Sequence, residues 1–227
     1  MPGFWLIVAY INNLEYVLFH SGFLPFARGW LHLYGKLSVM RIVVMVSGSG
    51  TNLQSIMDAV SSAELSVEIA AVGADKECTG IERAQAAGIE TFIVPPGSYS
   101  DRPAWNRALE EKIAGYTPDY VIFAGFMRIV DGQLVQRFEN RIVNTHPALL
   151  PSFPGAHGVR DALNHGVKIT GLTVHFVDSG VDTGPILAQA AVPVLDGDTE
   201  ETLHERIKVQ ERKLLVSTIA QLSEAQH

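Results

Sequence analysis

Asn144 and His146 stand one residue apart directly after an apolar run, in the stretch VNTHPALLPSFPG. An asparagine amide donates hydrogen bonds without changing its charge, whereas a histidine exchanges a proton near neutral pH. A tetrahedral intermediate needs both functions, because its oxyanion requires a donor and its attacking group must lose a proton. The pair is therefore a candidate catalytic site, although a single histidine near a strand end is more often structural. The prolines of the same stretch predict a rigid exit that holds the pair, or simply a loop.

A second polar segment, GLTVHFVDSGVDTGPI, follows another apolar run and contains Asp178 and Asp182. A carboxylate beside His146 would orient the imidazole and stabilise its cationic form. The residues alone leave both aspartates open for this role, and an Asp-Thr-Gly string is also an ordinary turn. His175, inside the expected strand, is interpreted as packed, or as a supporting group behind the reacting residues, rather than as a proton carrier. Because few metal ligands are clustered, we expect no catalytic metal.

The segment SGSGTNLQSIM, residues 47–57, predicts a glycine-rich turn that enters an amphipathic helix. The free N–H groups at a helix N-terminus favour an anion, and our hypothesis is a monophosphate. A Walker loop would need Gly-Lys-Ser/Thr, which is missing, and a dinucleotide fingerprint would place glycine where Leu53 stands. A plain tight turn between strand and helix is the alternative interpretation.

The segment DTEETLHERIKVQERKLLVSTIAQL predicts a long helix near the end of the chain. Asp198 is the expected cap, with Glu201 three residues later as a capping-box variant. Glu211 falls on the apolar stripe of this helix, and a buried carboxylate needs a partner. Lys208 is near enough in the helix to be that partner. The two residues form either a boundary salt bridge or a pair that holds a cationic amine of a ligand.

The strands expected to position these groups are apolar runs that alternate, in the first part of the domain, with helical patterns. This alternation predicts an α/β fold, doubly wound, with a mainly parallel sheet and helices on both faces. Ligands in such sheets bind outside the carboxyl ends of the strands, where several of the polar segments occur. The expected strands are residues 42–46, 67–72, 91–94, 120–123, 141–143, 171–177 and 186–194.

Composition bounds the function. The 227 residues, 47% hydrophobic and 18% charged, are enough for one large folding unit. A formal net charge of −7 disfavours a nucleic-acid partner, so we expect a small-molecule ligand. Cys78 is the single cysteine and permits no intramolecular disulfide, which favours a reducing compartment and predicts a cytoplasmic protein.

Residues 1–39 differ from the rest of the sequence. They are rich in aromatic residues, show no clean period and are interrupted by Asn12, Asn13 and Glu15. They are too interrupted for a membrane-spanning helix and lack the basic start of a signal peptide. We expect an extension that is poorly ordered or comes from a mis-assigned start, with a membrane-surface anchor as the alternative. The expected domain is residues 40–222, followed by a tail of residues 223–227.

Several segments together resemble one enzyme family. In order and spacing, SGSGTNLQSI, AGFMRIV, NTHPALLPSFPGAHG, TVHFVDSGVDTGPI and IKVQE resemble the phosphoribosylglycinamide formyltransferases, from Met40 to about Leu222. The resemblance implies that a formyl group passes from 10-formyltetrahydrofolate to the amine of glycinamide ribonucleotide in de novo purine biosynthesis. It implies catalytic roles for Asn144, His146 and Asp182, and so selects Asp182 over Asp178. The family can be monomeric or homodimeric.

The resemblance also implies two binding regions. Ser49, Gly50, Thr51 and Asn52 match the loop that grips the phosphate of the ribonucleotide, and Lys208 and Glu211 match positions near its phosphoribosyl and glycinamide groups. The folate region comprises Arg102 near the folate tail, Met127, the backbone around Arg128, Ile129 and Val130, and Asn144; His157 is expected behind the reacting groups. In the implied mechanism the amine attacks the formyl carbon, Asn144 donates to the oxyanion, and His146 with Asp182 moves protons between the amine and the departing folate nitrogen.

Some positions depart from the family pattern and other functions remain open. Ser179 and Gly180 replace a frequent acidic pair, and Arg212 and Val216 stand where relatives often have His and Pro, which affects binding details. A 10-formyltetrahydrofolate hydrolase would add a regulatory N-terminal domain, and a methionyl-tRNA formyltransferase would add a C-terminal β domain; neither addition is expected here. A non-catalytic folate- or phosphate-binding module is the third alternative, which the intact Asn-His-Asp set disfavours.

Overall fold

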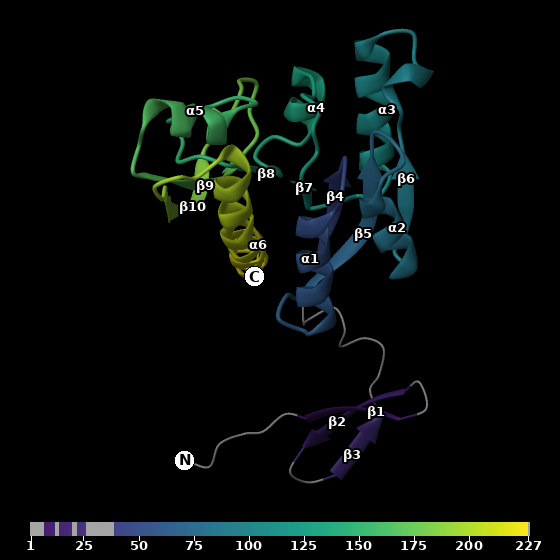
Figure 1. Cartoon of the computed structure of the whole chain (residues 1–227). Coiled ribbons are helices and arrows are strands. Elements are labelled where there is room, and N and C mark those ends of the chain that lie inside the picture. The colour runs from purple at the N-terminus through teal and green to yellow at the C-terminus, as the bar shows by residue number, and fades with distance from the viewer. Residues whose placement is uncertain (1–6, 12–13, 20–21, 26–38, 227) are drawn as a thin grey trace. The chain divides into compact units, whose positions relative to one another are not determined.

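The structure is a computed structural model that describes residues 7–11, 14–19, 22–25 and 39–226 (Figure 1). The chain divides into two units, residues 1–38 and 39–227, which are treated separately. In the first, β1 (Ile7–Ile11), β2 (Leu14–Phe19) and β3 (Gly22–Pro25) form a three-stranded antiparallel sheet. The prediction of a poorly ordered extension falls largely on residues outside the described ranges and stays a prediction.

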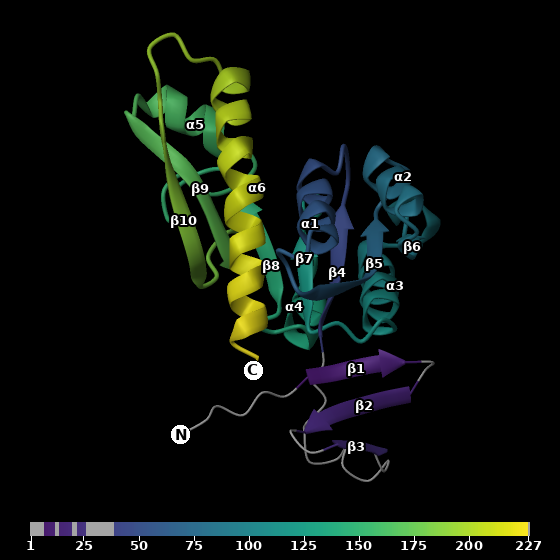
Figure 2. The same cartoon turned by 90° about the horizontal axis from the view of Figure 1, so that it is seen from below.

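The second unit is built on a seven-stranded sheet in the order β10-β9-β8-β7-β4-β5-β6. The strands from β6 to β8 are parallel, and β9 and β10 are antiparallel to their neighbours. Figure 2 shows β4 and β5 pointing the same way. A strand occurs at every expected position, and the prediction of a mainly parallel sheet is confirmed. The bounds are β4 (Met40–Val46), β5 (Val67–Ala74), β6 (Thr91–Ile93), β7 (Tyr120–Phe123), β8 (Ile142–His146), β9 (Ile169–Phe176) and β10 (Ile186–Pro193).

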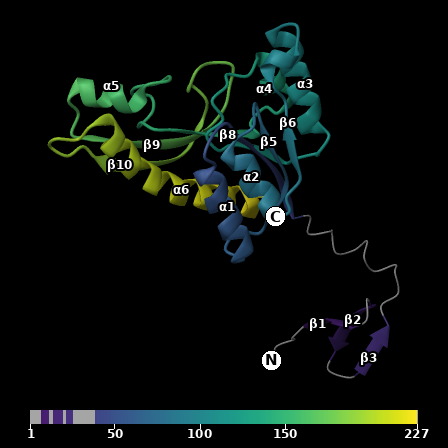
Figure 3. The ribbon, with the colours of Figure 1, turned by 45° about the vertical axis from the view of Figure 1, so that its right-hand side comes forward.

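Helices cover both faces of this sheet, as predicted. One apolar core joins the sheet to α1 (Thr51–Ser61), α2 (Thr79–Ala86) and α6 (Glu200–Glu224), and Figure 3 shows α6 alongside α1. The other core joins the opposite face to α3 (Arg102–Ala114) and α4 (Gly132–Arg137). The shorter α5 (Gly158–His165) packs with α6 over β9 and β10. None of the described helices is long and apolar enough to cross a membrane.

The strand order creates one favoured place for a ligand. From β4 the chain runs outward through β5 and β6, then returns past β4 to form β7 and β8 on the other side. Such a reversal leaves a crevice at the carboxyl ends of the two diverging strands, here β4 and β7. Val46 pairs with Ala74, and Phe123 pairs with Asn144. The segments that follow β4, β5 and β7 therefore leave the sheet beside the end of β8.

The end of β8 differs from the prediction. The strand was expected to stop at Val143, but it continues to His146. It continues because β9 pairs with it in antiparallel fashion, placing Asn144 opposite His175 and His146 opposite Thr173. The two candidate residues consequently lie on a hydrogen-bonded strand rather than in the loop after it.

The cap of α6 also differs from the prediction. Thr199, not Asp198, is the N-cap, and its side chain and that of Thr202 complete a reciprocal capping box. Asp198 instead accepts from the backbone of Leu195 and from the guanidinium of Arg206. Asp198 also accepts from the hydroxyl of Thr202 in the first turn, but the backbone N–H of Thr202 bonds to Thr199, which therefore holds the capping position.

Candidate active site

His146 lies at the centre of the polar groups at the end of β8. Its side chain is 4% exposed, and its Nδ1 is 3.3 Å from Oδ2 of Asp182. Its Nε2 is 2.8 Å from the carbonyl oxygen of Phe153. A carbonyl and a carboxylate can only accept hydrogen bonds, so a doubly protonated ring donates to both partners and a neutral ring donates to one. The histidine is therefore held at both nitrogens in an orientation set by the 153–155 loop and by Asp182.

Asp182 joins several parts of the site. Its Oδ2 accepts from the backbone N–H of Gly155 at 2.7 Å, and its Oδ1 is 3.6 Å from Nε2 of His175. Its backbone adopts a positive φ of 54°, a left-handed conformation that aspartate and asparagine tolerate better than most residues. The loop between β9 and β10 thus turns sharply to place one carboxylate between two imidazoles.

Asp178, the competing aspartate, has a different role in the same loop. Its Oδ1 accepts from the N–H of Gly180 at 3.0 Å and from the hydroxyl of Thr183 at 2.7 Å. These are the contacts of a turn-forming aspartate. Of the two candidates, Asp182 is the one beside His146.

A hydrogen bond to His175 orients the side-chain amide of Asn144. The amide Nδ2 of Asn144 is 3.3 Å from Nε2 of His175, whose Nδ1 is 2.8 Å from the carbonyl of Phe176. Because that carbonyl must accept, Nδ1 carries the proton and Nε2 is left to accept from the amide. Burial lowers the pKa of His175, against smaller opposing effects of the Phe176 carbonyl and the Asp182 carboxylate, which favours the neutral ring. His175 is packed, as expected, and it also fixes which way the Asn144 amide points.

Glu211 has a partner that the sequence did not indicate. The hydroxyl of Thr145, the residue between the two candidates on β8, donates to Oε1 of Glu211. The expected pairing of Lys208 with Glu211 does not form. The Nζ of Lys208 instead donates to Oε1 of Glu205 at 2.7 Å, on the outer face of α6. The half-buried Glu211 instead reaches the end of β8 through Thr145, whose side chain alternates along the strand with those of Asn144 and His146.

The turn between β4 and α1 has the features expected of an anion site. Gly50 has a positive φ of 68°, and a Cβ there would lie 2.6 Å from the Cα of Gly80, so only glycine fits. Gly50 gives α1 no side-chain cap, and the first turn carries no acidic residue. Asn52 is buried, and its Oδ1 has no hydrogen-bond partner among the described residues.

A shallow cavity of about 310 Å³ opens beside this turn. The guanidinium of Arg83 crosses it, donating to the carbonyl of Ser49 and to the side chain of Gln54. Arg212, one of the departures from the family pattern, contributes from α6. Two cations from different helices therefore stand near the N-terminus of α1. The cavity is lined by Thr51, Gln54, Ser55, Asp58, Arg83 and Arg212.

Residues 126–130, called here the β7 segment, follow β7, the strand that lies between β8 and β4 in the sheet. Met127 and Ile129 are 79% and 66% exposed, whereas Phe126 is buried. Val130 is half-buried against the core beneath α3 and α4. The guanidinium of Arg102 donates to the carbonyl of Ile129 at 2.6 Å. Two apolar side chains are thus presented to solvent from a segment whose backbone is fixed.

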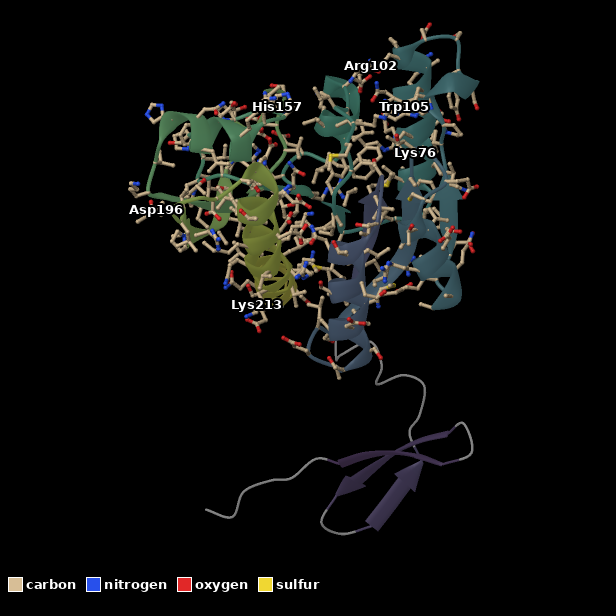
Figure 4. All side chains as sticks on the ribbon, viewed as in Figure 1. Lys76, Arg102, Trp105, His157, Asp196 and Lys213 are labelled. Carbon is tan, nitrogen blue, oxygen red and sulfur yellow. The ribbon has the colours of Figure 1, made fainter. Side chains whose placement is uncertain are left out.

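The two outlying expected residues lie toward the same end of this unit. Figure 4 shows Arg102 at the start of α3 and His157 before α5, both at the upper end of the view. His157 is exposed and makes no capping hydrogen bond with its side chain. Among the described residues, no three His, Cys, Asp or Glu side chains are grouped so as to hold a metal ion.

Sequence reasoning missed two residues near the site, Thr145 and Asp75. Asp75 follows β5 and binds the Arg128 side chain through its Oδ2, 2.7 Å from Nε. The signal for Asp75 was available, because it stands directly after a buried strand like the other polar groups. Thr145 was hidden because its partner is 66 residues away on α6.

Known proteins are similar to this chain in sequence and in fold. The chain is 54% identical over 183 residues to the phosphoribosylglycinamide formyltransferase of Mycobacterium tuberculosis strain H37Rv, covering 81% of this chain and 85% of the relative. It is 42% identical over 176 residues to the Escherichia coli K12 enzyme of the same name, covering 77% and 83%. The solved glycinamide ribonucleotide transformylase 1 of Symbiobacterium toebii superposes with a TM-score of 0.80 at 46% identity, covering 82% of this chain and 89% of that one.

A formyltetrahydrofolate deformylase is also similar in structure, at a lower level. The Pseudomonas syringae protein has a TM-score of 0.76 and 26% identity, and the match covers 82% of this chain but 62% of that one. The family model for formyl transferases matches residues 40–219, which contain every candidate residue described above. The chain therefore belongs to the formyl transferase family.

Proposed function

We propose that this protein transfers the formyl group of 10-formyltetrahydrofolate to the amine of glycinamide ribonucleotide, a step of de novo purine biosynthesis. The observation that carries the proposal is the meeting of Asn144, His146 and Asp182 at the end of β8. The β7 segment follows the neighbouring strand, and the turn before α1 follows β4, the next strand along the sheet. A formyl group there is within reach of an anionic acceptor and of a folate donor.

The ribonucleotide binds across the N-terminus of α1 and the middle of α6. The turn of Ser49, Gly50, Thr51 and Asn52 offers backbone N–H groups to the phosphate, with Arg212 and Lys208 adding positive charge. Glu211, held by Thr145 at the end of β8, accepts from the glycinamide amine and directs it toward the formyl carbon. An anion site and a carboxylate at the two ends of one crevice match a ligand with a phosphate and an amine.

The folate binds along the β7 segment. The exposed side chains of Met127 and Ile129 cover the flat ring system of the folate, and the backbone of residues 128–130 forms hydrogen bonds with the polar edge of that ring. Arg102, at the start of α3, lies where its charge can meet an acidic tail. Asn144 contributes to both ligands because it faces the atom that passes between them.

The chemistry follows from the three polar groups. The amine attacks the formyl carbon, a C–N bond forms, and the carbonyl electrons move to oxygen, where the amide N–H of Asn144 stabilises the charge. His146, with Asp182, takes the proton of the attacking amine and delivers it to the folate nitrogen as the old C–N bond breaks. The products are a formamide and tetrahydrofolate. For Nε2 of His146 to meet substrate, it must exchange its contact with the Phe153 carbonyl during turnover.

The alternative is hydrolysis, in which water replaces the amine. The structural similarity to a formyltetrahydrofolate deformylase is the reason to test for this reaction. The anion-binding turn and the Thr145–Glu211 pair favour an acceptor with a phosphate and an amine, because water needs neither.

The experiment measures tetrahydrofolate formation from 10-formyltetrahydrofolate, with and without glycinamide ribonucleotide. We expect turnover that requires the ribonucleotide and is lost in His146→Asn, while Asp196→Asn, a change at a fully exposed carboxylate, retains it. Equal turnover without ribonucleotide would establish a hydrolase. Folate binding without turnover in either case would leave a binding module.

The same proposal places the protein in the cytoplasm, where its single cysteine would remain reduced. Cell fractionation tests this location. Light scattering of the purified protein decides between a monomer and a homodimer.

A further inference from the structure

We infer that Asp75 is a positioning residue for the folate: it holds Arg128 and thereby fixes the β7 segment in its ligand-binding conformation. The inference rests on the proposed function, because it assumes that the β7 segment receives the folate. Asp75 itself lies beneath the segment and does not need to touch the ligand.

The contact between Asp75 and Arg128 is asymmetric in burial. The Asp75 side chain is 2% exposed and the Arg128 side chain 46% exposed, with Oδ2 and Nε 2.7 Å apart. A buried carboxylate is costly without a charged partner, so Asp75 binds Arg128 strongly from a fixed position. Burial tends to raise the pKa of Asp75, but the hydrogen bond and charge of Arg128, with the nearby Ser47 hydroxyl, outweigh it and the pKa lies below its usual value. The carboxylate is therefore charged at neutral pH, and the pair persists there.

Other contacts fix the backbone on both sides of Arg128. The N–H of Met127 donates to the hydroxyl of Ser47 at 2.9 Å, and the carbonyl of Ile129 accepts from Arg102. Asp131, just after the segment, donates its N–H to the side chain of Asn106 at 3.1 Å. The segment is thus tied to the ends of β4 and β5 and to α3.

These ties restrain the segment before any ligand arrives. The side chains of Met127 and Ile129 are exposed and apolar and make the binding surface of the segment, whereas its ties run to Arg128 or to the backbone of residues 127, 129 and 131. A segment that is already ordered loses less conformational entropy on binding. Of the ties, the Asp75 pair is the one that is charged on both sides and buried on one. Its loss should weaken folate binding and leave the reacting groups on β8 unaffected.

The test uses Asp75→Asn, Asp75→Ala and Arg128→Gln in the full-length protein, with Lys76→Gln as a matched change of an exposed neighbouring charge (Figure 4). We expect Asp75→Ala to raise KM for 10-formyltetrahydrofolate by on the order of 10-fold, with KM for the ribonucleotide and kcat within about twofold of the wild type. Asp75→Asn keeps an acceptor for Arg128 and should recover part of the loss. Lys76→Gln should match the wild type.

A double variant separates positioning from direct contact. If Asp75 acts through Arg128, then Asp75→Asn with Arg128→Gln should raise the folate KM no further than Arg128→Gln alone. Additive effects, or a folate KM unchanged in both Asp75 variants, would overturn the inference, as would an equal rise in both substrate KM values. Asp75→Asn, alone and with Arg128→Gln, leaves no buried unpaired carboxylate, so these two variants test the idea even where Asp75→Ala or Arg128→Gln does not fold.

Titration with tetrahydrofolate gives a second readout that needs no turnover. We expect its dissociation constant to rise with the Asp75 variants in parallel with the folate KM. If the wild type lacked ribonucleotide-dependent turnover but bound tetrahydrofolate, and Asp75→Asn weakened that binding, the proposed function would fail and the positioning role would stand. Unchanged binding in an active enzyme would reject the positioning role alone.

Discussion

Replacing Asp182 by asparagine tests the centre of the proposed mechanism. The carboxylate accepts from Gly155 and faces the ring nitrogens of His146 and His175. Asparagine has the same shape but no charge, and one of its two oxygen positions becomes an N–H₂ donor. If the N–H₂ takes the Oδ2 position, the acceptor for Gly155 and His146 is lost; if it takes the Oδ1 position, that acceptor remains but the negative charge beside His146 is lost. We therefore expect a large loss of kcat in a folded protein.

The size of the loss can be worked out from the geometry. A carboxylate 3.3 Å from an imidazolium is stabilising by about 5 kcal/mol at an effective dielectric constant of about 20. If the whole of this interaction were specific to the transition state, kcat would fall by roughly 5,000-fold. The amide dipole of asparagine retains part of it, so the expected fall is between about 100-fold and that limit. Both side chains are largely buried, which limits screening by solvent.

The assay compares Asp182→Asn with Asp178→Asn, a matched change in the same loop. Asp178 uses Oδ1 for both of its turn contacts, and the amide oxygen of asparagine can accept both. We expect Asp178→Asn to keep kcat within about threefold of the wild type. Steady-state rates with both substrates saturating, and the thermal midpoint of each variant, are measured together. A similar loss in both variants, or a kcat for Asp182→Asn within threefold of the wild type, would refute the assignment.

Three further changes test the surroundings of the site. Gly158→Ala places a Cβ 3.0 Å from Nε2 of His146, so we expect the ring to be displaced. Steady-state rates should show kcat lower by on the order of 10-fold, and urea unfolding should show a free energy of unfolding lower by about 1–3 kcal/mol. Thr145→Val removes the donor to Glu211 while keeping the shape of the side chain. The KM for the ribonucleotide should rise by at least about 10-fold while the KM for the folate stays constant. Thr145→Ser, which keeps the hydroxyl, should restore the KM for the ribonucleotide. An equal change in both KM values would contradict the placement of Glu211. The pKa of His175 is lower in the folded state, so the unfolded chain binds more protons as pH falls through about 6.5 and stability should decrease there. Urea unfolding at pH 7.5 and 5.5 measures this slope, which His175→Asn should reduce; an unchanged slope would show that another group causes it.

The fold could be predicted from the sequence because its main signals are local. Each of the expected apolar runs became a strand, and helices filled the intervals that showed helical patterns. The antiparallel pairing of β8, β9 and β10 depends on contacts between distant strands, and no local pattern reports it. That pairing extends β8 to His146, which is why the predicted strand end was three residues early.

The site could be predicted in part, for a similar reason. Residue type and position after an apolar run identified Asn144 and His146, but choosing between Asp178 and Asp182 required the resemblance to a family. The expected Lys208–Glu211 pair was wrong because helix spacing permits several partners for one lysine, and the nearer acceptor on the exposed face was taken. Helical spacing says which side chains can meet on one helix, but not that a strand will offer a better partner.

One carboxylate connects the two functions that a tetrahedral intermediate requires. Asp182 contacts His146, the proposed proton carrier, directly. It also lies beside His175, whose neutral ring accepts from the amide of Asn144, the proposed oxyanion donor. The charge of Asp182 acts on His175, whose pKa burial lowers, and Asp182 is one of the two acceptors that face the nitrogens of His146. The same aspartate thus meets one histidine that accepts from Asn144 and another whose two nitrogens both face acceptors. Because the groups share this partner, the cost of losing two of them should be less than the sum of the single losses, as is usual for residues that act as a unit.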